Sequence, residues 1–349
     1  MHQTYDINVE GFDPLISPEM FKQQHSMTEE SMKTVMNGRR DIKNILSGKD
    51  DRLMVIAGPC SVHDEKAALE YAEKLAALSE KVNDTFLPVM RVYFEKPRTT
   101  IGWKGLINDP HMDGRRDLTE GLNRARKLLL SITAMGVPTA TEFLDPIIPQ
   151  YIAGLVCWAA IGARTTESQT HREMASGLSM PVGFKNCTDG ALNTAINSMI
   201  AARSPQSFLG VDPNGRVGIV STKGNPDTHI VLRGGTRPNY DSVSIREAAE
   251  ALKAKNLPCA IVVDCSHANS GKRFSGQKIV WDDVIYQYLN GNGMIKGLML
   301  ESNLYEGSQK IVNGSEDLAY GVSVTDECIS METTEELLFS GREKIKNRS

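Results

Sequence analysis

The sequence contains no long hydrophobic run and few cysteines. None of its apolar runs approaches the ~20 residues that a membrane-spanning helix requires, and residues 1–10 lack the basic and apolar regions of a signal peptide. Its six cysteines form no Cys-x-x-Cys pair, so they are expected to be reduced thiols. These absences predict a soluble, cytoplasmic protein.

The sequence also has no excess of positive charge. It contains 39 Lys and Arg against 43 Asp and Glu, which gives a formal net charge of −4 at pH 7. This balance offers no overall attraction for nucleic acid or for an anionic membrane surface. A site that binds anions must therefore be built from a local cluster of basic residues.

Short apolar runs alternate with helical patterns from residue 52 onward. Several of these runs are almost continuously apolar, which is typical of parallel strands buried on both faces. No Gly-x-Gly-x-x-Gly motif follows the first run, which argues against a dinucleotide-binding fold. The pattern predicts an α/β fold, a closed (β/α)8 TIM barrel, with a doubly wound open sheet as the alternative. The expected strands are Leu53–Ala57, Leu87–Tyr93, Thr139–Leu144, Ala159–Ala163, Val182–Phe184, Ile230–Leu232, Ala260–Val263 and Leu298–Leu300.

Residues 1–50 differ from the rest of the chain. They begin with a polar, irregular stretch, and an apolar stripe at helical spacing follows. Ser26 and Glu29 have the spacing of a capping box, which predicts that this helix begins beside them. We therefore expect an N-terminal arm and helix over 1–50, and a barrel over 51–349.

One segment inside the barrel region breaks the alternation of strands and helices. Two apolar runs, 208–211 and 216–220, flank the turn sequence Asp-Pro-Asn-Gly at 212–215. An Asn-Gly turn between two such runs predicts a β-hairpin. We expect it at about 206–222, inserted on the outside of the barrel.

Basic side chains follow most of the predicted strands. In a TIM barrel the active residues lie at the C-terminal strand ends, so these side chains would meet at one mouth. One such Arg alone is most often a solvated residue at the rim, but grouping several costs repulsion and desolvation unless anions neutralise them. Because Arg and Lys bind phosphate and carboxylate, the concave mouth is expected to bind small polyanionic substrates rather than nucleic acid. The basic residues are Arg91, Lys96, Arg98, Arg164, Lys185 and Arg233.

Potential metal ligands also follow the strands. Cys60, His267 and Glu301 come after the first, seventh and eighth strands, and Asp326 lies in the loop beyond the eighth. Taken singly, Cys60 is more often a small buried hydrophobic residue, and His267 a hydrogen-bonded polar one. Together, sulfur, nitrogen and oxygen ligands suit Mn, Fe, Co, Cu or Zn better than Mg. Such an ion would polarise a carbonyl as a Lewis acid.

Six long motifs lie at these predicted strand ends. They are GPCS at 58–61, RVYFEKPRTT at 91–100, GWKG at 102–105, IGARTTES at 161–168, PVGFKN at 181–186 and LRGG at 232–235. With them the sequence resembles the 3-deoxy-D-arabino-heptulosonate 7-phosphate (DAHP) synthases, in their microbial, feedback-regulated class. The resemblance runs from about residue 15 to about residue 340. It implies condensation of phosphoenolpyruvate with erythrose 4-phosphate and release of phosphate, the first step of the shikimate pathway.

The resemblance assigns a role to each candidate residue. It implies one divalent metal ion held by Cys60, His267, Glu301 and Asp326. Arg98 and Thr99 would hold the phosphate of erythrose 4-phosphate. The residues implied for phosphoenolpyruvate are Arg91, Lys96, Arg164, Lys185 and Arg233, with Ala163 and His267 also at the substrate site.

The implied chemistry leaves two proton transfers to assign. Lys96 is expected to deliver a proton to the new alkoxide, with a metal-bound water as the rival donor. Glu142, acting through water, is a candidate for activating the water that adds at C2. The alternative function is another metal-dependent aldolase or synthase barrel for sugar phosphates, and a non-catalytic metabolite sensor is a more distant one.

The resemblance further implies regulation and assembly. The N-terminal extension and the hairpin would build contacts of a homodimer, or of a dimer of dimers, and border a pocket for an aromatic amino acid. Gly210 favours tyrosine as the inhibitor, because a glycine leaves room for the phenolic hydroxyl where phenylalanine-sensing relatives tend to have serine. The implied pocket residues are Pro149, Gln150, Gly177, Leu178, Ser179, Phe208 and Gly210.

Overall fold

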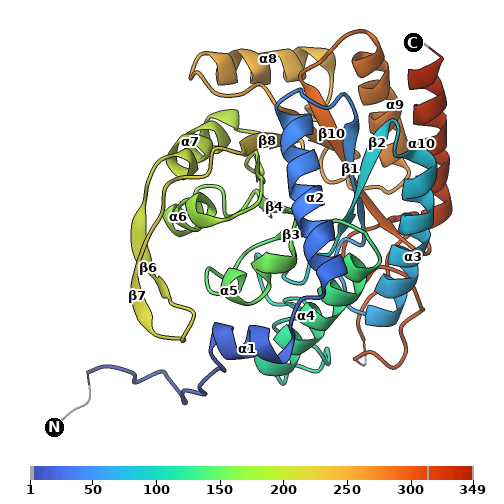
Figure 1. Ribbon diagram of the computed structural model, residues 1–349. Coiled ribbons are helices and arrows are strands. Elements are labelled where there is room, and N and C mark those ends of the chain that lie inside the picture. Colours follow the sequence, from blue (N-terminus) through green and yellow to red (C-terminus); the bar gives the residue numbers. More distant parts are fainter. Residues whose placement is uncertain (1–3, 313, 348–349) are drawn as a thin grey trace.

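The computed structural model describes residues 4–312 and 314–347 and contains the predicted barrel. Eight parallel strands follow the order β1-β2-β3-β4-β5-β8-β9-β10, and β10 pairs back onto β1 (Figure 1). This closure confirms the TIM barrel and excludes the open sheet. The strands are β1 Leu53–Gly58, β2 Phe86–Arg91, β3 Thr139–Glu142, β4 Trp158–Ile161, β5 Val182–Lys185, β8 Thr228–Leu232, β9 Ile261–Asp264 and β10 Ile295–Asn303.

The second, third and fourth strands each end two residues earlier than the sequence predicts. Val92, Tyr93 and Phe94 follow β2 without belonging to it, yet all three side chains are buried. The apolar run extends beyond the strand because the loop after β2 is also buried in the protein. Hydrophobic residues are favoured in a buried loop as they are in a buried strand, so the sequence pattern does not show where the strand ends.

Helices cover the outside of the barrel. Helix α3 is typical: the Asp64 side chain accepts hydrogen bonds from the first backbone N–H groups of the helix, and Tyr71, Leu75 and Leu78 are buried on one face. None of the helices in 4–312 and 314–347 has the length and apolar character needed to span a bilayer. The helices between and after the strands are α3 Glu65–Val82, α4 Leu118–Ala134, α5 Pro149–Ile152, α6 Gln169–Gly177, α7 Leu192–Arg203, α8 Ser242–Lys253, α9 Gly276–Leu289 and α10 Met331–Lys346, with a short 3-10 turn at Ala153–Leu155 and a two-residue strand, β11, at Ile329–Ser330.

The N-terminal region forms two helices, α1 Pro18–Gln24 and α2 Glu29–Leu46. The capping prediction is wrong by two residues, because the Thr28 side chain, not that of Ser26, accepts the N–H of Ser31. Ser26 instead donates its hydroxyl to the carbonyl of Gln23 at the end of α1. The sequence did not predict α1, whose seven residues are too few for a clear periodic signal.

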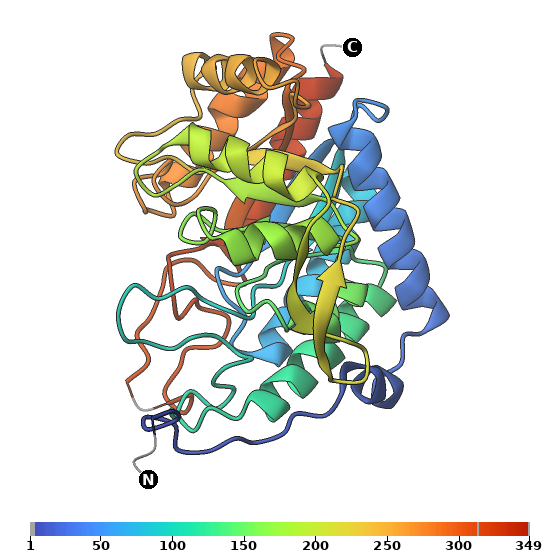
Figure 2. The ribbon, with the colours of Figure 1, turned by 90° about the vertical axis from the view of Figure 1, so that its left-hand side faces the viewer.

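Helix α2 closes the N-terminal end of the barrel. Its buried residues Val35, Ile42 and Ile45 share one hydrophobic cluster with side chains inside the barrel, such as Met54 and Trp158. Figure 2 shows α2 on one side of the barrel and the long strand-to-helix loops on the other. The loop side is therefore the open mouth.

The predicted hairpin is confirmed as β6 Ser207–Val211 and β7 Val217–Ser221, paired antiparallel. It lies outside the barrel beside α6 (Figures 1 and 2). At its tip, the carbonyl of Pro213 accepts the N–H of Glu19 from α1 at 2.8 Å. The arm and the hairpin thus contact each other.

Candidate active site

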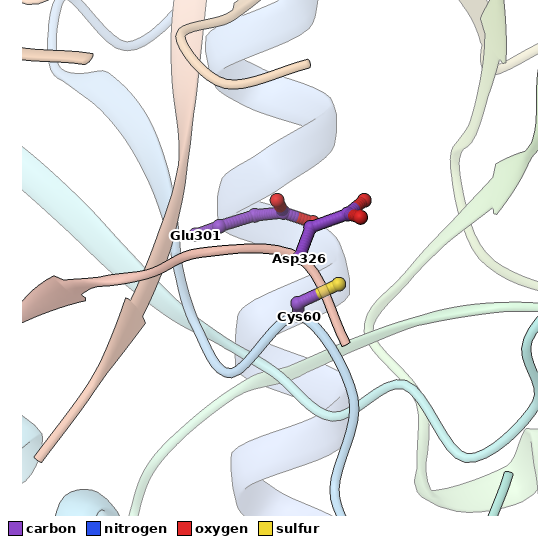
Figure 3. A group of neighbouring side chains, drawn as sticks. All are labelled: Cys60, Glu301 and Asp326. Carbon is purple, nitrogen blue, oxygen red and sulfur yellow. The ribbon is translucent and has the colours of Figure 1, made fainter. Parts of the chain in front are cut away.

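Three of the four predicted metal ligands come together at the mouth. One ligand atom each from Cys60, Glu301 and Asp326 lies within 4.8 Å of the others (Figure 3). Cys60 and Glu301 are neighbours because β1 pairs with β10, and Gly58 lies opposite Glu301 in this pairing. Both are buried, whereas Asp326 is exposed. The thiol and carboxylate donors suit a transition-metal ion with one side open to substrate.

The fourth predicted ligand borders this cluster rather than joining it. The Nε2 atom of His267 lies 3.7 Å from Glu301 Oε1, and its Nδ1 atom lies 2.9 Å from Asp264 Oδ2. His267 has a backbone φ of 55°, which is uncommon for a residue other than glycine. The free nitrogen of His267 therefore faces the cluster.

The basic side chains of Arg91 and Lys96 contact the cluster of Cys60, Glu301 and Asp326. Arg91 is 1% exposed, and its guanidinium lies 2.9 Å from Glu301 Oε1. Lys96 Nζ lies 3.0 Å from Cys60 Sγ. Burial alone would raise the pKa of Glu301, but the nearby imidazole of His267 and the charges of Arg91 and Lys96 lower it to about 2. Glu301 is thus held as a carboxylate, whereas burial and the charge of Glu301 raise the pKa of the Cys60 thiol.

Arg91 lies deep in the mouth and is almost fully buried. As the last residue of β2 it points into the barrel, where it also donates to the carbonyls of Pro59 and Cys60. Its guanidinium stacks on the ring of Tyr93, 3.6 Å from the centroid. In this arrangement Arg91 supports the cluster from beneath.

The other basic residues surround the mouth. Lys185 is buried, with Nζ 2.9 Å from Asp264 Oδ2. Arg233 is 9% exposed, and burial, followed by the nearby charge of Arg164, lowers its pKa. In the part of the chain that the structure describes, Arg98, Arg164 and Arg233 have no carboxylate within ion-pair distance. These three arginines are available for anionic groups of a ligand.

A cleft of about 1250 Å³ is lined by residues of the loop after β2, among them Arg98, and by Asp326 of the cluster. Arg98 is held by a hydrogen bond from its Nε to the carbonyl of Trp103 at 2.8 Å. Thr99 is exposed at the tip of this loop, and half-buried Ala163 precedes Arg164 after β4.

Two further buried carboxylates, Glu95 and Glu142, lie after the second barrel strand and at the end of the third, and only Glu142 was predicted as a candidate from the sequence. Glu142 ends β3, is 7% exposed, and its Oε1 has no hydrogen-bond partner among the described residues. Glu95 was missed, although it lies within the RVYFEKPRTT motif. Its carboxylate accepts the backbone N–H groups of Leu144 and Asp145, both at 3.2 Å. Burial raises the pKa of Glu95 to about 8 despite these bonds.

The residues implied for regulation lie mostly where α6 meets the hairpin. Gly177 ends α6, followed by Leu178 and Ser179, and Phe208 and Gly210 lie on β6. The Ser176 and Thr222 hydroxyls, 2.6 Å apart, join α6 to the end of the hairpin. Pro149 and Gln150 begin α5, which lies on the same side of the barrel (Figure 1).

The chain is similar in sequence and in structure to known proteins. The sequence model described as the DAHP synthetase I family matches residues 24–339. Two curated proteins of Escherichia coli (strain K12) are each 51% identical to the chain: the Tyr-sensitive phospho-2-dehydro-3-deoxyheptonate aldolase over 333 residues (95% of this chain, 94% of that protein) and the Phe-sensitive one over 347 residues (99% of each). A Trp-sensitive aldolase of the same strain is 48% identical over 338 residues, which is 97% of each chain. A solved structure of phospho-2-dehydro-3-deoxyheptonate aldolase from Francisella tularensis superposes with a TM-score of 0.95 at 45% identity, covering 98% of this chain and 100% of that one.

Proposed function

The chain belongs to the DAHP synthetase I family, which carries out the first step of the shikimate pathway. We propose that the chain catalyses this step with one divalent metal ion held at the cluster of Cys60, Glu301 and Asp326. The reaction joins phosphoenolpyruvate, erythrose 4-phosphate and water to give DAHP and phosphate. One observation supports the substrate assignment most directly. Arg98, Arg164 and Arg233 face the same mouth without a carboxylate partner among the described residues, and two phosphorylated substrates would supply the missing anions.

The residues of the cluster fit a metal ion by their chemistry. Cys60, Glu301 and Asp326 offer sulfur and oxygen donors, and His267 Nε2 is next to them as a fourth. Mn, Fe, Co, Zn and Cu suit this donor set. When bound, such an ion would polarise the aldehyde carbonyl of erythrose 4-phosphate as a Lewis acid.

The basic residues would hold and align phosphoenolpyruvate. The residues proposed to bind its phosphate and carboxylate are Arg91, Lys96, Arg164, Lys185 and Arg233. Arg91 and Lys96 also contact the cluster, at Glu301 and Cys60. This alignment brings C3 of phosphoenolpyruvate against the aldehyde carbon, and orientation alone can contribute several kcal/mol to the rate. The carbon–carbon bond then forms between these two atoms.

Two proton transfers complete the reaction. Lys96 Nζ would give a proton to the former aldehyde oxygen as it becomes a hydroxyl group. Glu142, with one carboxylate oxygen unpartnered within the described residues, would accept a proton through the water that adds at C2. The bond between C2 and the phosphate oxygen breaks, and inorganic phosphate leaves. The assay for this function is simultaneous loss of phosphoenolpyruvate and release of phosphate, both requiring erythrose 4-phosphate. Phosphate release without erythrose 4-phosphate would argue against it.

Substitutions should separate the two substrate subsites. Lys185→Ala and Arg233→Ala are expected to raise the KM for phosphoenolpyruvate, and Arg98→Ala the KM for erythrose 4-phosphate. Each change removes a charge-assisted contact of about 2–3 kcal/mol, which corresponds to about 30- to 150-fold. Steady-state kinetics with each substrate varied in turn measures this. Lys253→Ala, at the end of α8, serves as a control, and equal effects of all three changes on both substrates would refute this division.

We also propose that L-tyrosine is the strongest inhibitor among the aromatic amino acids, followed by phenylalanine and then tryptophan. Gly210 lies on the hairpin, and a Cβ atom there would come within 2.7 Å of Val220 Cγ2. A serine at this position would crowd a phenolic hydroxyl, and a hydroxyl left without a partner costs about 1–3 kcal/mol. Gly210→Ser should therefore shift preference towards phenylalanine, and Ser179→Phe should abolish inhibition while sparing catalysis. Inhibition titrations with the three amino acids decide this, and stronger inhibition of the unmodified protein by phenylalanine or tryptophan would show the Gly210 argument to be wrong.

The chain is proposed to assemble as a homodimer or as a dimer of dimers through the arm and the hairpin. Leu209, Val217 and Ile219 on the outer face of the hairpin are 77–79% exposed, and Tyr5 and Phe12 of the arm are 72% and 80% exposed. Burying each such side chain would contribute about 1.5–3 kcal/mol. Light scattering at micromolar concentration should give the mass of a dimer or a tetramer, and Leu209→Asp with Ile219→Asp should lower it. A monomeric unmodified protein would contradict the proposal.

A further inference from the structure

Asp264 joins the metal-binding side of the mouth to the phosphoenolpyruvate side. It is the last residue of β9, and its side chain is completely buried. Its Oδ2 atom lies 2.9 Å from Lys185 Nζ and also 2.9 Å from His267 Nδ1. Its Oδ1 atom accepts the backbone N–H of Ser266 at 3.0 Å. One carboxylate oxygen is thus shared by two side chains with different proposed tasks.

This sharing restricts both partners. A buried carboxylate is costly unless charges and hydrogen bonds surround it, and Asp264 has partners on both oxygens. Lys185 comes from β5 and His267 from the loop after β9, so the two would have no common anchor without this carboxylate. A movement of Lys185 therefore changes the position of the carboxylate that His267 contacts. A movement of His267 affects Lys185 in the same way.

The 2.9 Å contact with the Asp264 carboxylate favours the tautomer of His267 that carries its proton on Nδ1. When Nδ1 donates its proton to Asp264, Nε2 keeps its lone pair. Nε2 is the atom 3.7 Å from Glu301 Oε1, on the side of the cluster. A carboxylate that holds the other nitrogen of a ligating histidine orients the ring and makes it a better ligand. The Ser266 hydroxyl lies 2.8 Å from the same Nδ1 but carries no charge.

We propose that Asp264 is a positioning residue that couples metal binding to phosphoenolpyruvate binding, by orienting His267 towards the metal cluster and Lys185 towards the substrate. The inference rests on the proposed function and goes beyond it, because it makes the two binding events depend on one buried carboxylate. In this role Asp264 acts through His267 and Lys185, the two side chains that it contacts.

The test is the Asp264→Asn variant, which keeps the shape of the side chain and removes its charge. Calorimetric titration of the metal-free protein with Mn²⁺ should show an affinity about 10- to 100-fold below that of the unmodified protein. The KM for phosphoenolpyruvate, measured at saturating Mn²⁺, should rise as well. Ser266→Ala is the matched control, and it should change neither quantity by more than a few-fold.

Two further variants separate the partners of Asp264. In a Lys185→Met background, Asp264→Asn should add little to the KM for phosphoenolpyruvate but should still weaken Mn²⁺ binding. This double variant also removes the lysine that the single variant leaves buried without an anion, so it keeps the metal measurement possible if Asp264→Asn alone fails to fold. The coupling would be overturned if Asp264→Asn, alone or together with Lys185→Met, bound Mn²⁺ as tightly as the unmodified protein does. It would also be overturned if Asp264→Asn alone weakened Mn²⁺ binding but left the KM for phosphoenolpyruvate unchanged. Absence of Mn²⁺ binding or DAHP formation in the unmodified protein would instead reject the proposed function.

Discussion

Replacing Cys60 by alanine is expected to abolish DAHP formation while the barrel stays folded. The thiol is one of three ligand groups within 4.8 Å of one another, and its Sγ atom also lies 3.0 Å from Lys96 Nζ. Carbonyl polarisation by a metal ion is worth several kcal/mol, so its loss should slow turnover more than about 100-fold. The rate of phosphoenolpyruvate loss, measured with added Mn²⁺, provides the readout.

Controls distinguish metal loss from unfolding. Cys187→Ala removes another buried thiol, outside the cluster, and should keep full activity. Circular dichroism should show the same melting profile for both variants within a few degrees. In the unmodified protein, EDTA should stop turnover, and Mn²⁺, Co²⁺ or Fe²⁺ should restore it. Full activity in excess EDTA would contradict a metal-dependent reaction.

The second large effect is expected at Lys96. Lys96→Met keeps the length of the side chain but removes the proton that the new hydroxyl group requires. General acid catalysis by a positioned side chain contributes about 10²- to 10⁴-fold, so kcat should fall by that factor. Steady-state kinetics at saturating substrates measures it, with Lys74→Met on the outer helix α3 as the control. If kcat stays unchanged while the KM for phosphoenolpyruvate rises, Lys96 binds substrate and a metal-bound water supplies the proton.

Much of the fold follows from local patterns in the sequence. The strands of a closed parallel sheet are buried on both faces, and the sequence shows this as apolar runs at the correct places. The Asn-Gly turn identified the hairpin in the same way. The sequence pattern gave wrong element ends where tertiary contacts determine the structure. Val92, Tyr93 and Phe94 are buried in a loop and do not extend the strand. Ser26 donates a hydrogen bond at the end of α1 and does not cap the start of α2.

The site could be predicted to the level of strand ends but not of side-chain partners. The TIM-barrel rule placed Cys60 and Glu301 together, because their strands are neighbours. The six basic residues look alike in the sequence, but the folded protein neutralises two of them, because Arg91 pairs with Glu301 and Lys185 pairs with Asp264. Which carboxylate points at which cation depends on side-chain rotamers in the folded barrel. For this reason the sequence pattern could not reveal Asp264 as the bridge.

Metal-dependent formation of DAHP is tested most directly by product analysis with mass spectrometry, using the unmodified protein before and after metal removal. The Mn²⁺-loaded protein, given phosphoenolpyruvate and erythrose 4-phosphate, should form DAHP and phosphate in equal amounts. The metal-free protein should form neither until Mn²⁺ is returned. DAHP formation at an equal rate without metal, or phosphate release with no seven-carbon product, would contradict the account.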